Sequence, residues 1–147
     1  MKKFKKNLFI ISTGRSDYGL LKPLIISLNK SKKISSRLII TGTHLSHFHG
    51  MTIKEVLKDK LNIYKKIKIT LPKDDSYSIA KNFSNAVLKF SKLFKQENPD
   101  LIIVLGDKYE TFAVATSALL NRVPIAHIHG GEITKGAIDD SIRHALT

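Results

Sequence analysis

The sequence contains no cysteine. Disulfides and thiolate metal sites are therefore excluded, and a cytoplasmic location is compatible with this composition. No apolar run approaches the roughly 20 residues needed to span a bilayer, so we expect no membrane contact. The lysine-rich start resembles the charged region of a signal peptide, but the apolar run after it is only about five residues long. We interpret this segment as a lysine-flanked first strand and expect a cytoplasmic protein.

Arginine is also scarce: it occurs four times, although the formal net charge is +13. Residues 1–100 hold 21 Lys and Arg against 7 Asp and Glu, whereas residues 101–147 hold 4 against 5. The lysines are scattered among apolar and polar residues, which is typical of solvated faces. Arginine is the usual reader of base edges. We therefore do not expect nucleic-acid binding, because that alternative rests on the positive charge alone.

What the chain does contain is an alternation of apolar runs and amphipathic segments. Its 147 residues have the length of one compact domain with a single core. Periodicity predicts strands over 7–13, 37–42, 64–71, 101–105 and 123–128, and helices over 20–29, 51–60, 76–96, 110–120 and 139–145. Such alternation indicates the α/β class, with a Rossmann-like, doubly wound parallel sheet.

Polar turns follow four of these strands, over residues 13–19, 42–50, 106–110 and 127–140. In open parallel sheets, ligands bind at the carboxyl ends of the strands. In the first turn, two glycines allow close backbone approach and Arg15 can bind phosphate oxygens, with Ser16 and Asp17 beside it. Surface exposure of Arg15 at an ordinary glycine turn is the alternative. The turn matches neither a Walker loop nor a dinucleotide fingerprint.

The second and third turns each offer two interpretations. His44 is expected to hydrogen-bond a sugar or phosphate; a metal site with the other loop histidines is an alternative that no ligand spacing supports. Asp107 lies where an acid or base would be mounted, although an N-cap also explains an aspartate there. We expect Glu110, one turn into the next helix, to interact with the helix dipole.

The stretch "HIHGGEITKGAIDDSIRH", residues 127–144, is the richest in ionisable groups. Strand alternation predicts that the histidines at positions 127 and 129 point the same way. Helical spacing predicts two ion pairs, Asp140 with His144 and Asp139 with Arg143. Gly130 and Gly131 would then let a ligand approach the backbone. Capping carboxylates with surface ion pairs are the alternative.

Taken together, these turns resemble the hydrolysing UDP-N-acetylglucosamine 2-epimerase family of sialic and legionaminic acid biosynthesis. The matching stretches are "TGRSDYGLLKPL", "TGTHLS", "GMTIKEV", "VLGDKYETFAVATSALLNRVPIAHIHGGE" and "GAIDDSIRHALT". The resemblance implies a GT-B architecture, of which residues 1–147 form the amino-terminal Rossmann-like domain and the second domain is absent from this chain. It also implies a UDP-sugar substrate, no redox cofactor, no metal and a possible homo-oligomer.

The implied reaction removes the C2 proton of a UDP-2-acetamido sugar while UDP leaves C1, and water then adds to the glycal. By resemblance, Asp107 and Asp139 occupy catalytic carboxylate positions, and either His129 or Glu132 is the third acid or base. Arg15 occupies a position near the pyrophosphate. Substrate contacts are also expected from Ser16, Asp17, His44, Lys108, Gly130, Gly131, Arg143 and His144.

Two hypotheses of different class follow from these observations. The first is the amino-terminal half of a hydrolysing 2-epimerase that is inactive as an isolated fragment. The second is a sugar-nucleotide-binding or partner-binding module without turnover. UDP-N-acetylglucosamine and a UDP-2,4-diacetamido-trideoxy sugar are both open as substrates.

Overall fold

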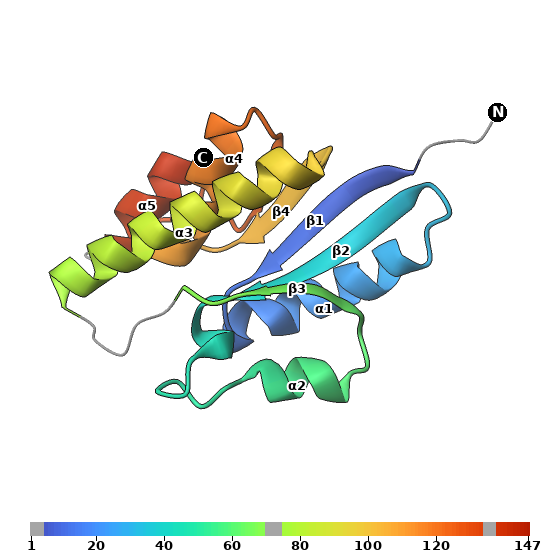
Figure 1. Ribbon diagram of the computed structural model, residues 1–147, viewed down its shortest axis with the longest axis horizontal. Helices are drawn as coiled ribbons and strands as arrows, with labels where there is room; N and C mark the ends of the chain where they lie inside the picture. The colour runs from blue at the N-terminus through green and yellow to red at the C-terminus, as the bar shows by residue number, and fades with distance from the viewer. Residues whose placement is uncertain (1–4, 70–74, 134–137) are drawn as a thin grey trace.

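The computed structural model describes residues 5–69, 75–133 and 138–147 of the chain. They form a five-stranded parallel sheet in the order β3-β2-β1-β4-β5, with helices on both faces (Figure 1). The α/β prediction is therefore confirmed. The elements are β1 (Lys6–Ser12), α1 (Arg15–Asn29), β2 (Ile34–Thr41), a 3-10 helix η1 (Gly42–Leu45), α2 (Ile53–Lys58), β3 (Ile63–Ile67), α3 (Ser76–Glu97), β4 (Leu101–Leu105), α4 (Tyr109–Leu120), β5 (Ile125–Ile128) and α5 (Ile138–Leu146).

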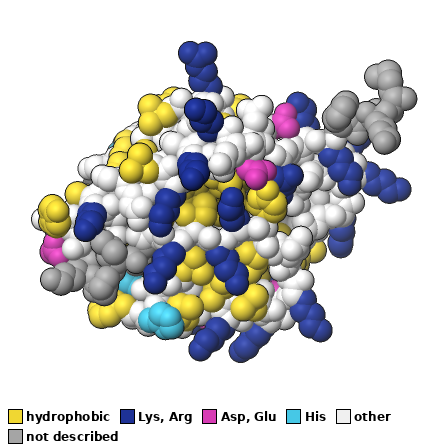
Figure 2. Space-filling model, viewed as in Figure 1, with side chains coloured by type: hydrophobic (Ala, Val, Ile, Leu, Met, Phe, Trp, Pro, Cys, Tyr) yellow, Lys and Arg dark blue, Asp and Glu magenta, His cyan; other side chains and the backbone are white. Residues whose placement is uncertain are grey.

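Two apolar layers hold the helices against the sheet. Phe9 and Ile102 point from the central strands toward α3 and α4, whereas Ile10 and Ile103 point toward α1. Because β1 and β4 are covered on both faces, their sequences are continuous apolar runs, as in other buried parallel strands. No helix in the described part of the chain is long and apolar enough to cross a membrane. Figure 2 shows one face of the molecule, on which basic side chains outnumber acidic ones.

The start of α1 differs from the prediction. The helix begins at Arg15, not near Leu20, because Asp17 satisfies the backbone at its amino end. The Asp17 carboxylate accepts hydrogen bonds from the Thr13 N–H at 2.6 Å and the Gly14 N–H at 2.8 Å. Most of the turn predicted over residues 13–19 is therefore the first turn of a helix.

The bounds of two strands also differ. β5 begins at Ile125 and ends at Ile128, two residues later than predicted at its start. β3 ends at Ile67, and part of the predicted extension to residue 71 lies outside the described residues. The other predicted elements agree with the structure to within three residues at each end.

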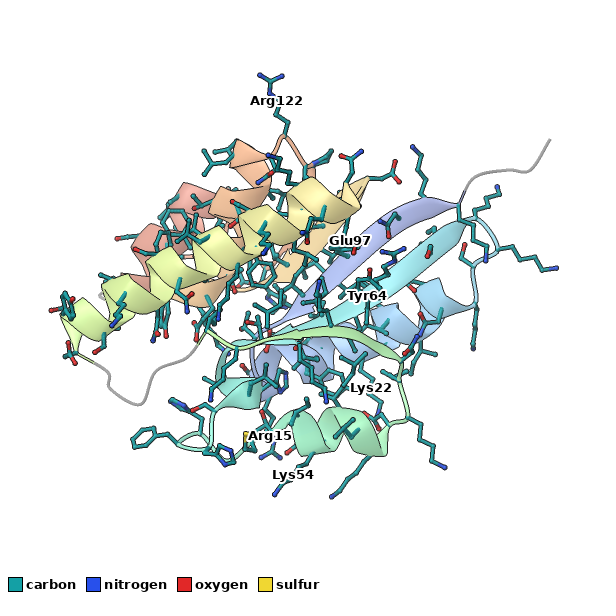
Figure 3. The ribbon with its side chains drawn as sticks, viewed as in Figure 1. Arg15, Lys22, Lys54, Tyr64, Glu97 and Arg122 are labelled. Carbon is teal, nitrogen blue, oxygen red and sulfur yellow. The ribbon has the colours of Figure 1, made fainter. Side chains whose placement is uncertain are left out.

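Arg37, on β2, links the sheet to the end of α3. Its Nη1 donates to Glu97 Oε2 at 2.6 Å and to Tyr64 Oη at 2.9 Å. Its guanidinium also lies 4.4 Å from the centre of the Tyr64 ring. Figure 3 shows Tyr64 and Glu97 on neighbouring elements, β3 and α3. A hydrogen bond from Tyr64 and the positive charge of Arg37 lower the pKa of the Glu97 carboxyl.

We expect Arg37→Ala to lower the free energy of unfolding by about 1–2 kcal/mol, because it removes a partly exposed ion pair and a cation–π contact. Urea unfolding followed by circular dichroism measures this change. Arg122→Ala is the matched control, since Arg122 extends into solvent (Figure 3), and a change below about 0.5 kcal/mol is expected there. Equal losses in both variants would show that the contacts of Arg37 with Glu97 and Tyr64 do not stabilise the fold.

Candidate functional site

Turns from three strands contact one another at the carboxyl edge of the sheet. Lys108, which precedes α4, places its Nζ 3.1 Å from Ser16 Oγ and 3.9 Å from Asp17 Oδ1 at the start of α1. Thr43, which follows β2, donates its hydroxyl to the Thr13 carbonyl at 3.1 Å. The expectation that the polar turns gather on one edge is therefore confirmed for these three.

Gly14 makes this convergence possible. A Cβ atom at this position would lie 2.6 Å from Thr43 Oγ1 and 2.9 Å from Lys108 Nζ. Both distances are shorter than van der Waals contact, so a larger residue would make the Thr43 hydroxyl and the flexible end of Lys108 move and would disturb these contacts. Gly14 thus lets the side chains of the neighbouring turns come close, and its extended backbone needs no glycine.

Of the residues expected to bind substrate in the first turn, Asp17 is the least available. It is only 3% exposed, and it accepts the two backbone N–H bonds described above together with the Thr13 hydroxyl at 3.1 Å. Its observed role is to shape the turn. The Arg15 side chain, in contrast, is 74% exposed and lies 3.2 Å from Glu55 of α2 (Figure 3).

A second cluster is formed by Asp107, Glu132, Arg143 and His129. The Arg143 guanidinium donates to the Asp107 carboxylate through Nη2 and lies 3.5 Å from Glu132 through Nη1. His129 Nδ1 lies 3.0 Å from the other Glu132 oxygen. The Arg143 side chain is only 10% exposed, so this ion pair with Asp107 is partly desolvated.

The two ion pairs predicted within α5 have different outcomes. His144 Nε2 lies 3.6 Å from Asp140 Oδ2, which confirms the first pair. The predicted pair of Asp139 with Arg143 is wrong, because Arg143 points toward the β4 turn and binds Asp107. Asp139 is left exposed at the start of the helix.

The prediction that His127 and His129 point the same way has no basis in strand geometry. β5 ends at Ile128, and His129 has a φ of 61°, so strand geometry does not orient its side chain. His127 Nε2 donates to the Gly106 carbonyl at 2.8 Å, which ties the ends of β4 and β5 together.

The two glycines that follow differ in their surroundings. A Cβ on Gly130 would lie 3.0 Å from His127 Nδ1 and 3.1 Å from Thr147 Oγ1, so this residue is packed against protein. Gly131 has a φ of 74° and open space around it. Both glycines are exposed, and Gly131 has the more open surroundings.

A cavity of about 270 Å³ lies beside Lys108 and Thr43, between α3, α4, α5 and the η1 turn. Asp139, Lys108 and Glu110 supply its charged groups, and its remaining lining is Thr43, Ile79, Tyr109, Ile138 and Ile142. Asp107 and Arg15 do not line this cavity. Both nevertheless follow neighbouring parallel strands, β4 and β1, at the same edge of the sheet.

Glu110 is the residue that sequence reasoning underestimated. It stands in the first turn of α4, as expected for an interaction with the helix dipole, but it is only 3% exposed. Burial raises the pKa of its carboxyl, the negative charge of Asp17 adds to the increase, and the positive charge of Lys108 opposes it. A buried carboxyl of this kind can keep its proton closer to neutral pH and act as an acid. The small residues of α4, which let both sides of the helix pack, are the signal that could have revealed this burial.

His44 was expected to contact a sugar or phosphate, and the structure gives it a different role. Its ring is completely buried, with Nε2 2.9 Å from Ser12 Oγ and Nδ1 2.8 Å from Thr52 Oγ1. Both nitrogens are thus occupied, and the ring offers no atom to a ligand. It holds the η1 turn, which carries Thr43, against β1.

Burial lowers the pKa of His44, and Lys108 adds to this effect, while Asp17, Glu55 and a bond to Thr52 oppose it. The unfolded chain takes up a proton at this histidine below its ordinary pKa of 6.5, whereas the folded chain does so only at lower pH. The unfolded state therefore binds more protons, and stability falls as the pH drops below about 6.5. We expect a smaller loss of stability between pH 7.5 and 5.5 in His44→Gln, measured by urea unfolding.

His47→Gln is the matched control for this prediction, because His47 is exposed in the same loop. The free energy of unfolding of His47→Gln should depend on pH as strongly as that of the parent chain. An unchanged pH dependence in His44→Gln would show that other groups cause the effect.

Within the described residues, no three His, Asp or Glu side chains come together in a way that could hold a metal ion.

Comparison with known proteins agrees with this architecture. The family of UDP-N-acetylglucosamine 2-epimerases matches residues 26–147. A GDP/UDP-N,N'-diacetylbacillosamine 2-epimerase (hydrolyzing) from Campylobacter jejuni is 43% identical over 97% of this chain, and a UDP-N,N'-diacetylbacillosamine 2-epimerase from Legionella pneumophila is 34% identical over 97%. The chain spans about 37% of the length of both relatives.

Solved structures show the same fold. A UDP-N-acetylglucosamine 2-epimerase crystal structure superposes with a TM-score of 0.85 at 22% identity, covering 97% of this chain and 39% of that one. A Neisseria meningitidis enzyme bound to UDP-GlcNAc gives a TM-score of 0.81 at 21% identity, covering 95% and 37%. The sheet thus corresponds to one Rossmann-like domain of a GT-B protein, as predicted. The chain belongs to the UDP-N-acetylglucosamine 2-epimerase family, and its sequence relatives of highest identity above are hydrolysing enzymes.

Proposed function

We propose that this chain forms one wall of the active site of a hydrolysing 2-epimerase that acts on a nucleotide-linked 2-acetamido sugar. The observation that carries the proposal is the cavity at the carboxyl edge of the sheet, where Asp139, Lys108 and Glu110 face one space. A lysine near carboxylates in such a place suits a substrate with a diphosphate leaving group and a neighbouring C–H bond that loses its proton. The 43% identity to a hydrolysing enzyme supports the same reaction class.

The proposed reaction needs a base, an acid and a site for the leaving group. A carboxylate removes the proton from C2 while the C1–O bond breaks and the nucleoside diphosphate leaves, which gives a glycal. Water then adds its hydroxyl to C1, and C2 takes a proton on the opposite face. The products are a free 2-epimeric sugar and the nucleoside diphosphate.

The described residues can share these tasks. Asp139 stands at the rim of the cavity and Asp107 in the neighbouring cluster, so these are the proposed catalytic carboxylates. Lys108 and the exposed Arg15 are the proposed contacts to the diphosphate. Either His129 or Glu132 remains the proposed third acid or base, with Arg143 holding Glu132 near Asp107.

We further propose that the substrate is a 2,4-diacetamido-trideoxy sugar nucleotide in preference to UDP-N-acetylglucosamine. In such a sugar an acetamido group replaces the hydroxyl at C4, and C6 is a methyl group. It is therefore less polar than N-acetylglucosamine. Isoleucines at positions 79, 138 and 142 give the cavity the apolar lining that these groups would need. The relatives at 43% and 34% identity are named for N,N'-diacetylbacillosamine, whereas a UDP-N-acetylglucosamine 2-epimerase from Neisseria meningitidis is 30% identical.

The experiment supplies both sugar nucleotides to the chain alone and to the complete protein with the length of its relatives. Proton NMR follows the free nucleoside diphosphate and the configuration at C2 of the released sugar. Turnover of both substrates, with higher kcat/KM for the diacetamido sugar, is the expected result for the complete protein. Binding without release of nucleotide in the complete protein would instead identify a sugar-nucleotide-binding module.

Four finer expectations accompany this proposal. A product that enters sialic or legionaminic acid synthesis is supported by the 33% identity to polysialic acid biosynthesis protein P7 of Escherichia coli. A second domain would supply the opposite wall of the cleft, and a homo-oligomer and a cytoplasmic location complete the prediction. Size-exclusion chromatography of the complete protein, combined with light scattering, measures the oligomeric state.

A further inference from the structure

A second cavity, of about 440 Å³, opens between β3 and α3. None of its lining residues belongs to the candidate active site. Five of them are lysines, and the others are two apolar residues and one glutamine: Lys65, Lys66, Ile67, Lys68, Lys89, Lys92, Leu93 and Gln96. Figure 2 shows this face of the molecule, with dark blue side chains on both sides of a yellow strip. We call this feature the lysine groove.

Protection of an exposed strand explains only part of the lysine groove. β3 is the edge strand of the described sheet, and lysines on edge strands prevent pairing with other chains. Lys89 and Lys92, however, belong to α3 and not to the edge strand. The Nζ of Lys89 donates to the Lys68 carbonyl at 2.5 Å, which brings charge from the helix onto the strand.

The charge around the lysine groove is not balanced within it. No carboxylate lines the groove in the part of the chain that the structure describes. Five ammonium groups around one hollow repel one another, and a bound anion would relieve that repulsion. The floor formed by Ile67 and Leu93 is apolar, so the occupant that fits best combines negative charges with apolar groups.

We propose that the lysine groove binds an acidic, extended segment of a partner protein. Its carboxylates would pair with the lysines of β3 and α3, while its alternate apolar side chains would lie on Ile67 and Leu93. An extended segment suits an edge strand, because main-chain groups of β3 can add to the side-chain contacts. This inference does not depend on the proposed enzymatic activity.

The lining favours a polypeptide over a nucleic acid or a membrane. It contains no arginine and no aromatic residue among the described positions, and these residue types read bases and stack on them. A bilayer presents a broad surface, whereas this feature is a groove with an apolar floor. Peptide side chains can enter such a groove while their acidic neighbours remain at its rim.

The experiment measures binding of a fluorescein-labelled octapeptide of alternating Glu and Val to this chain by fluorescence anisotropy at 0.15 M salt. The triple variant Lys66→Glu/Lys68→Glu/Lys92→Glu should raise Kd by about tenfold or more, since three attractive contacts become repulsive. The matched control Lys30→Glu/Lys32→Glu/Lys54→Glu makes the same change of net charge away from the groove. It should raise Kd by no more than about twofold.

Several results would overturn the inference. These are the absence of peptide binding, equal losses in the two triple variants, and undiminished binding when every Glu of the peptide is replaced by Gln. Tighter binding of a single-stranded oligodeoxynucleotide or of phosphatidylglycerol vesicles, weakened by the groove variant alone, would assign the groove to that ligand instead. Circular dichroism of each variant confirms that the fold is retained.

Discussion

Asp139→Asn is expected to lower kcat of the complete protein by about 10²–10⁴-fold, the range for loss of a general acid or base. Asparagine keeps the size of aspartate but can neither accept nor donate the proton at C2. Asp139 is exposed at the rim of the cavity, so the melting temperature should not change. Release of nucleoside diphosphate from the diacetamido sugar nucleotide, followed with a coupled assay, measures the effect.

The neighbouring carboxylate provides the control for this prediction. Asp140 pairs with His144 on the same helix and does not line the cavity. Asp140→Asn should therefore reduce kcat by less than about threefold, the scale of a small electrostatic change. Equal reductions in the two variants, or an unchanged kcat in Asp139→Asn, would remove Asp139 from the catalytic assignment.

Arg143→Ala is expected to lower the free energy of unfolding by about 2–3 kcal/mol, because it leaves the partly buried Asp107 carboxylate without its charged partner. The guanidinium is largely buried and binds Asp107 and Glu132 from two other segments of the chain. Its loss would also release both carboxylates from their positions. Urea unfolding of the chain, monitored by circular dichroism, measures the change.

Two further variants separate the ion pair from simple packing. Arg143→Lys keeps the charge but cannot donate from two nitrogens, so an intermediate loss of stability is expected. The double variant Asp107→Asn/Arg143→Met should lose less stability than the sum of its single changes, because no charge is left unpaired. Strictly additive losses would show that the two residues do not stabilise each other.

The fold could be predicted from the sequence because its strands and helices follow simple periodicities. The continuous apolar run Leu101–Leu105 has the same bounds in the structure as in the prediction, and α3 differs by one residue. The gathering of polar turns was also predictable, since the carboxyl ends of parallel strands meet at one edge. These features depend on residues close together in the sequence.

Individual partnerships within the site could not be predicted in the same way. Arg143 has an acidic residue four positions away on its own helix, yet its partner is Asp107, because the rotation of α5 against the sheet decides which carboxylate it reaches. His44 looked like a loop residue free to bind a ligand, but β1 and the segment before α2 enclose it. Glu110 was misjudged for the same reason, because burial depends on packing across the whole domain.

The contact of Lys108 with Ser16 joins residues 92 positions apart in the sequence. It depends on β1 lying beside β4, and Leu8 pairs with Leu101 in that alignment. During synthesis, the side of β1 that pairs with β4 therefore stays unpaired until β4 has left the ribosome. This edge of the sheet is among the last parts of the domain to assemble, so slow docking of β4 would affect the candidate site before it affected α1 or β2.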